Sequence, residues 1–203
     1  MRKMKASLLL TVLLGLAASA KVIRAADEDP NGPPQISGDY RVVITQTCVR
    51  TPYQLPPANG FDPNTRQLQV QGEALTAIGS GLMRFGEDGS VQVLEGVQTE
   101  VSLAQLAPGQ APVAPPAQFT CGGTYTIQDR KVAFSLSCDV SVPQPGVKVT
   151  LGPQNFEGWV DQRKQTLSLT NIAGGIQTIT VSVAGNPVQQ RQRVCTQHAL
   201  AIR

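Results

Sequence analysis

The sequence predicts an all-β protein, a single antiparallel up-and-down barrel of about eight strands, with a β-sandwich as the alternative. Two observations lead to this prediction. Apolar and polar residues alternate with a period of two through much of the chain after residue 36, as in Tyr40-Arg41-Val42. Gly and Pro recur roughly every ten residues, which is typical of turns between short strands. Outside the N-terminal segment, a helical pattern is found only weakly, around residues 97–106.

The N-terminal segment MRKMKASLLLTVLLGLAASA has the three parts of a secretory signal peptide. Three basic residues precede the apolar run Ser7–Leu16, and Ala18-Ser19-Ala20 supplies small residues for cleavage. We therefore expect residues 1–20 to be a signal peptide and the protein to be exported, either to the periplasm or to the medium. An uncleaved anchor and a second cleavage position after Ala25 are the alternatives. Later apolar runs are interrupted, so we expect no membrane span after cleavage.

Cleavage also changes the charge of the chain. The full sequence has 17 basic and 14 acidic residues, and removal of residues 1–20 takes away three basic ones, which leaves 14 against 14. A nearly neutral mature protein without a basic cluster gives no electrostatic indication of nucleic-acid binding.

The rest of the chain divides into a leader and one domain. Residues 21–36 are polar and interrupted by Pro and Gly, so we expect a disordered leader before a barrel domain over residues 37–203. A Pro- and Ala-rich segment near residues 102–119 is expected to be a long loop. It would either cover a barrel mouth or be a solvated linker.

The first predicted hairpin surrounds Asp88-Gly89, a strong turn signal. A three-residue loop over residues 87–89 pairs Phe85 with Val91 and Met83 with Val93, which places all four apolar residues on one face. A two-residue loop would break that face, so the hydrophobic pattern favours the longer loop.

The second predicted hairpin is CGGTYTIQDRKVAFSLSC, from Cys121 to Cys138. A turn at Asp129-Arg130 pairs Tyr125 with Phe134 and places the two cysteines opposite each other, close enough for a disulfide. Four cysteines in an exported chain indicate two disulfides. We expect Cys121–Cys138 and, by remainder, Cys48–Cys195, which would tie the first strand to the last. The crossed pairings remain open, while the wide spacing disfavours a zinc site, so no metal is predicted.

Catalytic motifs are sparse. His198 is the sole histidine and shares an alternating face with Val194, Thr196, Leu200 and Ile202. If that face is the barrel interior, His198 points inward and is a weak candidate acid or base; otherwise it is a structural histidine. No GxSxG, Walker A or GxGxxG motif occurs, and we expect no cofactor. The protein is therefore expected to be non-enzymatic.

Aromatic residues give the candidate binding site. Those on predicted strands could line a pocket for an apolar ligand, or fill a core. The candidate binding residues are Tyr40, Phe85, Tyr125, Phe134, Trp159 and His198.

The chain resembles the calycin-type small barrels, loosely the lipocalins and the allene-oxide-cyclase/dirigent-like barrels. The residues that carry this resemblance are Gly38-Asp39-Tyr40, the segment FGEDGSV (Phe85–Val91), Gly123-Thr124-Tyr125 and Asp129. Tyr40 stands where lipocalins have Trp. The resemblance implies architecture alone, and no catalytic residue is transferred from it.

Three functions follow as hypotheses. The first is an exported barrel that binds a small apolar ligand without catalysis. The second is an interaction module that binds a protein of an envelope or surface assembly. The third is a cofactor-free cyclase or isomerase that uses His198 with Tyr125 or Tyr40.

Overall fold

The computed structural model describes residues 36–103, 109, 111–171 and 175–203, and every regular element in this part of the chain is a β-strand. The predicted signal peptide and residues 21–35 of the predicted leader lie outside the described residues. The strands are β1 (Gly38–Arg50), β2 (Glu73–Phe85), β3 (Ser90–Ser102), β4 (Ala117–Gln128), β5 (Lys131–Val140), β6 (Val147–Val160), β7 (Thr166–Asn171), β8 (Ile176–Val183) and β9 (Asn186–Ile202).

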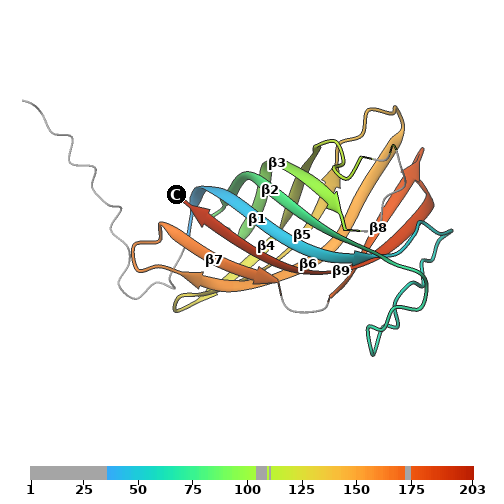
Figure 1. Cartoon of the computed structure of the whole chain (residues 1–203). Coiled ribbons are helices and arrows are strands. Elements are labelled where there is room, and N and C mark those ends of the chain that lie inside the picture. Colours follow the sequence, from blue (N-terminus) through green and yellow to red (C-terminus); the bar gives the residue numbers. More distant parts are fainter. Residues whose placement is uncertain (1–35, 104–108, 110, 172–174) are drawn as a thin grey trace, which may run out of the picture. The chain divides into compact units, whose positions relative to one another are not determined.

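The sheet closes on itself (Figure 1). Strands β1 to β6 each pair antiparallel with the next, and β9 pairs with β1. Strands β7 and β8 share one position between β6 and β9, because β7 pairs with residues 156–160 of β6 and β8 pairs with residues 147–151. The nine described strand segments thus form an eight-stranded closed antiparallel barrel. The predicted barrel is confirmed, and the sandwich alternative is wrong.

The two ends of the barrel differ in their connections. The hairpin end carries the tight turns at residues 86–89, 129–130 and 161–165. The loop end carries the connections 51–72, 103–116 and 141–146 and the β8–β9 turn. Ile36, which we expected in the leader, is fully buried at the hairpin end, and its carbonyl accepts a hydrogen bond of 2.6 Å from the Tyr125 hydroxyl. The folded part therefore includes Ile36.

Both predicted hairpins have the expected register. Phe85 pairs with Val91 and Met83 with Val93 across β2 and β3. Across β4 and β5, pairing runs from Gln128↔Lys131 through Tyr125↔Phe134 to Cys121↔Cys138. The two disulfides are Cys48–Cys195 and Cys121–Cys138, as predicted, so the first and last strands are covalently joined.

An aromatic cluster fills the hairpin end. The Phe85 ring meets the rings of Tyr40, Tyr125 and Phe134 edge to face, with centroids 5.5, 5.1 and 6.2 Å away. The Tyr40 hydroxyl donates to the Lys164 carbonyl at 2.7 Å, so its polar atom is satisfied as the ring is buried. Burial raises the pKa of both tyrosines. This end of the interior is a packed core.

Two inward glycines let neighbouring strands approach closely. A Cβ at Gly123 would collide with the carbonyl of Ser135, and a Cβ at Gly158 with the carbonyl of Ser168. Any side chain at either position would push two strands apart, so glycine is required by the curvature of the barrel.

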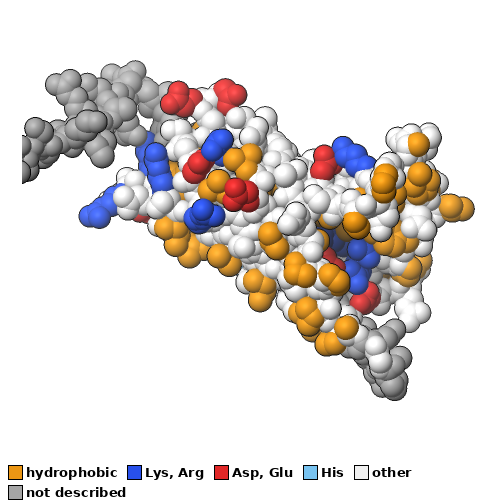
Figure 2. All heavy atoms as spheres, turned by 90° about the horizontal axis from the view of Figure 1, so that it is seen from above, with side chains coloured by type: hydrophobic (Ala, Val, Ile, Leu, Met, Phe, Trp, Pro, Cys, Tyr) orange, Lys and Arg blue, Asp and Glu red, His pale blue; other side chains and the backbone are white. Residues whose placement is uncertain are grey.

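The outer face is mixed in character. Figure 2 shows one side of the molecule, where charged side chains form small groups and apolar side chains lie between polar atoms. Exposed apolar residues of β1, β2 and β9 include Val43, Ile78 and Leu200, which are 55, 62 and 46% exposed. The outward positions of the strands therefore do not follow a strictly polar pattern.

The two disulfides should contribute unequally to stability. Loop-closure entropy predicts about 5 kcal/mol for Cys48–Cys195, whose cysteines are 147 residues apart, and about 3 kcal/mol for Cys121–Cys138, 17 residues apart. The double variant Cys48→Ala/Cys195→Ala should therefore unfold at lower urea than Cys121→Ala/Cys138→Ala. Urea titration followed by circular dichroism measures both. Equal midpoints, or the reverse order, would contradict this account.

Candidate functional site

The interior of the barrel is hollow from its middle toward the loop end. A cavity of about 330 Å³ lies there, bounded at its inner end by Met83, Phe134 and Phe156. Phe134 and Phe156 stack with centroids 5.0 Å apart, and they mark the boundary between the aromatic core and the cavity. An eight-stranded barrel is just wide enough to hold one small ligand, and the volume agrees with this limit.

One wall of the cavity is apolar and comes from β4, β5 and β6. Its side chains alternate inward along these strands, so each second residue reaches the cavity. They include the disulfide Cys121–Cys138, which is part of the wall as well as a covalent link. The apolar wall consists of Ala117, Phe119, Cys121, Phe134, Leu136, Cys138, Val140, Val149, Leu151 and Phe156.

The opposite wall is polar and comes mainly from β1, β3 and β9. Gln46 and Gln197 are 5 and 1% exposed, and the Gln197 Nε2 donates to Gln46 Oε1 at 2.6 Å and to Gln154 Oε1 at 3.3 Å. Within the described residues, Gln46 Nε2 and Gln197 Oε1 have no hydrogen-bond partner. Buried amides are normally satisfied, so one donor and one acceptor at this wall call for an explanation.

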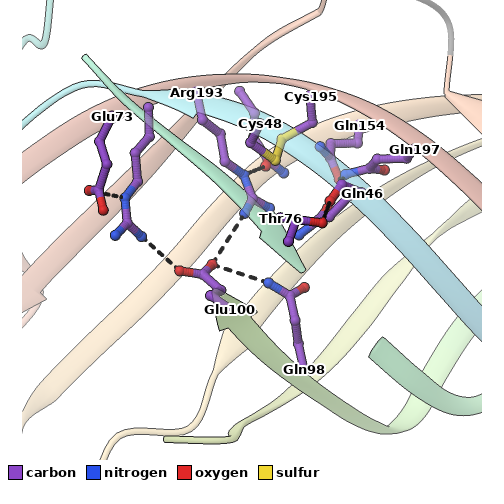
Figure 3. A network of polar contacts seen from close by, with 12 residues as sticks. Gln46, Cys48, Glu73, Thr76, Gln98, Glu100, Gln154, Arg193, Cys195 and Gln197 are labelled. Atoms are coloured by element: carbon purple, nitrogen blue, oxygen red, sulfur yellow. Dashed lines mark hydrogen bonds and ion pairs between the residues drawn. A yellow bond between two sulfur atoms is a disulfide. The ribbon is translucent and has the colours of Figure 1, made fainter. Parts of the chain in front are cut away.

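Beyond the glutamines lies a network of arginines and glutamates (Figure 3). Arg50 donates to Glu73 at 2.9 Å and to Glu100 at 2.7 Å. Arg193 donates to Gln177 at 2.5 Å, and its distance to Glu100 is 3.8 Å. The Glu100 carboxylate also accepts from Gln98 Nε2 at 3.1 Å, so both of its oxygens are engaged.

Burial dominates the electrostatics of this network. The Arg193 side chain is 4% exposed, and desolvation lowers its pKa to about 10, which leaves it charged at neutral pH. Burial also lowers the pKa of Arg191. The hydrogen bond from Arg50, followed by that from Ser102, lowers the pKa of Glu73. Three guanidinium groups are thus held near two carboxylates inside the barrel.

Loop segments complete the cavity at the loop end. The Arg191 guanidinium lies over the ring of Tyr53, 4.4 Å from its centroid. Residues of the Pro-rich connection run back along the end of β3, since Ala114 N donates to the Glu100 carbonyl and Ser102 N to the Pro112 carbonyl. Ala114 and Pro115 line the cavity. The connection thus contributes to the cavity with its described part, while residues 104–108 and 110 lie outside the description.

The predicted binding residues separate into three groups. Phe134 lines the cavity. Tyr40, Phe85 and Tyr125 are buried in the aromatic core at the hairpin end instead. The last group, Trp159 and His198, lies on the outer face; Trp159 is 61% exposed, and His198 is exposed between Thr45 and Thr170. Phe134 is thus the predicted binding residue that reaches the cavity.

The outward position of His198 corrects one sequence interpretation. The face of β9 that carries Leu200 and Ile202 is the outer face, and the inward face carries Cys195, Gln197 and Ala199. Cys48 belongs to the inward series of β1, so Cys195 must also face inward to bond it, and a period of two then places every even residue of this stretch outside. None of His198, Tyr125 and Tyr40, which the cyclase or isomerase hypothesis named, lines the cavity.

Sequence reasoning missed the polar wall. Gln46 continues the inward series Tyr40, Val42 and Ile44, so the period of β1 already placed it inside. Gln197 and Arg193 share the parity of Cys195, which gave a similar signal. Arg191 also shares that parity, whereas Glu100 carried no comparable signal, because a charged residue on a strand is usually interpreted as exposed.

The described residues were also inspected for a metal site and a membrane-spanning helix, and the chain was compared with known proteins. Three or more His, Cys, Asp or Glu side chains that could together hold a metal ion do not occur in the described ranges. The described part of the chain also contains no helix long and apolar enough to cross a membrane. Neither a scan against family models nor searches of curated proteins and solved structures gave a match to this chain.

Removing the Glu100 carboxylate should destabilise the fold. Glu100→Gln leaves the buried Arg193 without an ionic partner, and breaking a buried pair in this way costs about 3 kcal/mol. Asp39→Asn is the matched control, because it removes a carboxylate from the exposed pair with Arg84 and should change stability little. Urea unfolding of both variants is the measurement. Adding Arg193→Met to Glu100→Gln should recover part of the loss; a Glu100→Gln variant as stable as Asp39→Asn would contradict the assigned role.

Proposed function

We propose that the protein is an exported barrel that binds one small, largely apolar molecule in its interior and performs no chemistry on it. The cavity of about 330 Å³, which lies in the barrel interior against an apolar wall from three adjacent strands, is the observation that carries this proposal. Cavities of this size and character are typical of small-molecule sites.

The unequal filling of the barrel supports this proposal. The hairpin end is closed by four aromatic rings, while the middle and the loop end carry smaller side chains such as Val140, Val149 and Ala199 around an open volume. A purely structural barrel of eight strands is filled along its whole length. Retaining a cavity sacrifices packing stability, which is consistent with use of the volume by a ligand.

The proposal includes export of the protein and draws on its likeness to known small barrels. Two disulfides fit an oxidising compartment, and the N-terminal segment has the pattern of a signal peptide. The likeness to calycin-type barrels, either lipocalin-like or allene-oxide-cyclase/dirigent-like, concerns architecture, and only by analogy does it agree with a ligand held in the interior. The interaction-module hypothesis stays a prediction that a pull-down from envelope extract would test.

Filling the cavity should abolish binding. N-phenyl-1-naphthylamine, a neutral apolar fluorescent probe, should bind the wild-type protein saturably with one probe per chain. Val149→Trp places an indole in the cavity from its apolar wall and should weaken binding at least tenfold. Fluorescence titration measures the dissociation constant.

The matched control for this variant is Val43→Trp, which introduces the same side chain on the outer face. It should leave the dissociation constant within twofold of the wild-type value. Thermal unfolding of each variant checks that it is folded. Non-saturable probe binding by the wild-type protein, or equal weakening by both variants, would overturn the proposed function.

A further inference from the structure

We propose that the cavity selects a small anionic amphiphile, whose oxyanion lies against Arg191 and whose apolar body lies against β4–β6. This inference rests on the proposed function, because it specifies the ligand class of the same cavity. Three independent features of the polar wall carry it: its charge balance, its unpartnered atoms and its position opposite the apolar wall.

The network holds one more cation than it has carboxylates. Arg50, Arg191 and Arg193 are the cations of the network, while Glu73 and Glu100 are its carboxylates. Arg50 lies within 2.9 Å of both carboxylates, and Arg193 approaches Glu100. Within the described part of the chain, Arg191 forms no ion pair with a carboxylate, although the charges of Glu100 and Glu73 act on it from farther away. Its guanidinium instead meets the Tyr53 ring.

Three residues that line the cavity each carry a buried atom without a hydrogen-bond partner among the described residues. The buried Nε of Arg191 has no hydrogen-bond partner in the described ranges, and the same holds for Gln46 Nε2. Both residues line the cavity, and both atoms are donors. The third such atom, Gln197 Oε1, is an acceptor. Gln46 pairs with Gln197, which lies six residues from Arg191 along β9, so the cationic donor and the glutamine pair face different stretches of the cavity. The cationic donor favours a ligand oxyanion, and the glutamine pair, with one donor and one acceptor, would suit a neutral polar group farther along the same ligand.

The two walls set the orientation of the ligand. A molecule in the cavity contacts the apolar side chains of β4, β5 and β6 on one side and the polar residues of β1, β3 and β9 on the other. A neutral apolar molecule would leave Arg191 Nε, Gln46 Nε2 and Gln197 Oε1 without hydrogen-bond partners, which is unfavourable in a buried site. A cationic amphiphile would add a fourth positive group near two carboxylates. An anionic amphiphile can place its apolar body against the apolar wall and its oxyanion beside Arg191.

Matched competitors test this selection. N-phenyl-1-naphthylamine bound to the full mature protein is displaced by 1-naphthoate, 1-naphthamide or 1-naphthylmethylammonium, which share one apolar body and differ in charge. The wild-type protein should bind naphthoate about tenfold or more tightly than naphthamide, as expected for hydrogen bonds to a charged group, and the cation most weakly. Arg191→Met should reduce naphthoate affinity to that of naphthamide measured in the same variant. Arg191→Lys should retain a preference for the anion.

The outcomes separate the two proposals. Saturable probe binding with equal affinity for naphthoate and naphthamide would overturn the anionic selection and leave the proposed function standing. An anion preference that persists in Arg191→Met would overturn the role of Arg191. Equal loss of the probe and all three competitors in Arg191→Met would assign this residue a structural role and also overturn the inference. Absence of saturable probe binding by the wild-type protein would overturn the proposed function itself.

Discussion

The pairing of β1 with β9 is the constraint on which the rest of the structure depends. It converts a meander of strands into a closed barrel without free edges, and the Cys48–Cys195 disulfide fixes it covalently within the paired stretch. Because a strand has a period of two, this one bond also fixes which residues of β1 and β9 share a face, and the burial of both cysteines shows that this face is the inward one. Gln46 and Gln197, which lie next to the cysteines along each strand's inward face, are buried for that reason.

Closure creates one interior, of which one part is a packed core and the other part is a cavity. Edge-to-face and stacked aromatic contacts fill the hairpin end, and the tyrosine hydroxyls there are satisfied by carbonyl groups of Lys164, Ile36 and Gly86. The loop end instead combines an apolar wall with a buried ionic network. Aromatic packing is therefore concentrated at the end where the turns are short. The cavity adjoins the loop end, where Ala114 and Pro115 of the described part of the Pro-rich connection line it.

The sequence predicted the parts of this fold that depend on local pattern. Turn chemistry at Asp88-Gly89 and the alternation between Cys121 and Cys138 were enough for the register of both hairpins. The inward face of β9 was harder to predict from the sequence. Its inward residues are Gln197, Ala199 and Ala201, while the larger Leu200 and Ile202 lie outside. The positions of the larger apolar residues thus favoured an inward His198, whereas His198 faces outward. The predicted disulfide, combined with strand parity, would have given the correct one.

The polar wall shows why the candidate site was less predictable than the fold. Arg193 and Gln197 are nearly fully buried, against the general preference of these residue types for the surface. An ionic network of this kind is usually no more stabilising than apolar residues of the same volume, because desolvation offsets the attraction between its charges. Local rules fail most often where a protein keeps groups for a purpose other than stability. An excess cation and unpartnered amide atoms beside an open volume meet that description, and they link the least predictable residues of the barrel to its proposed ligand.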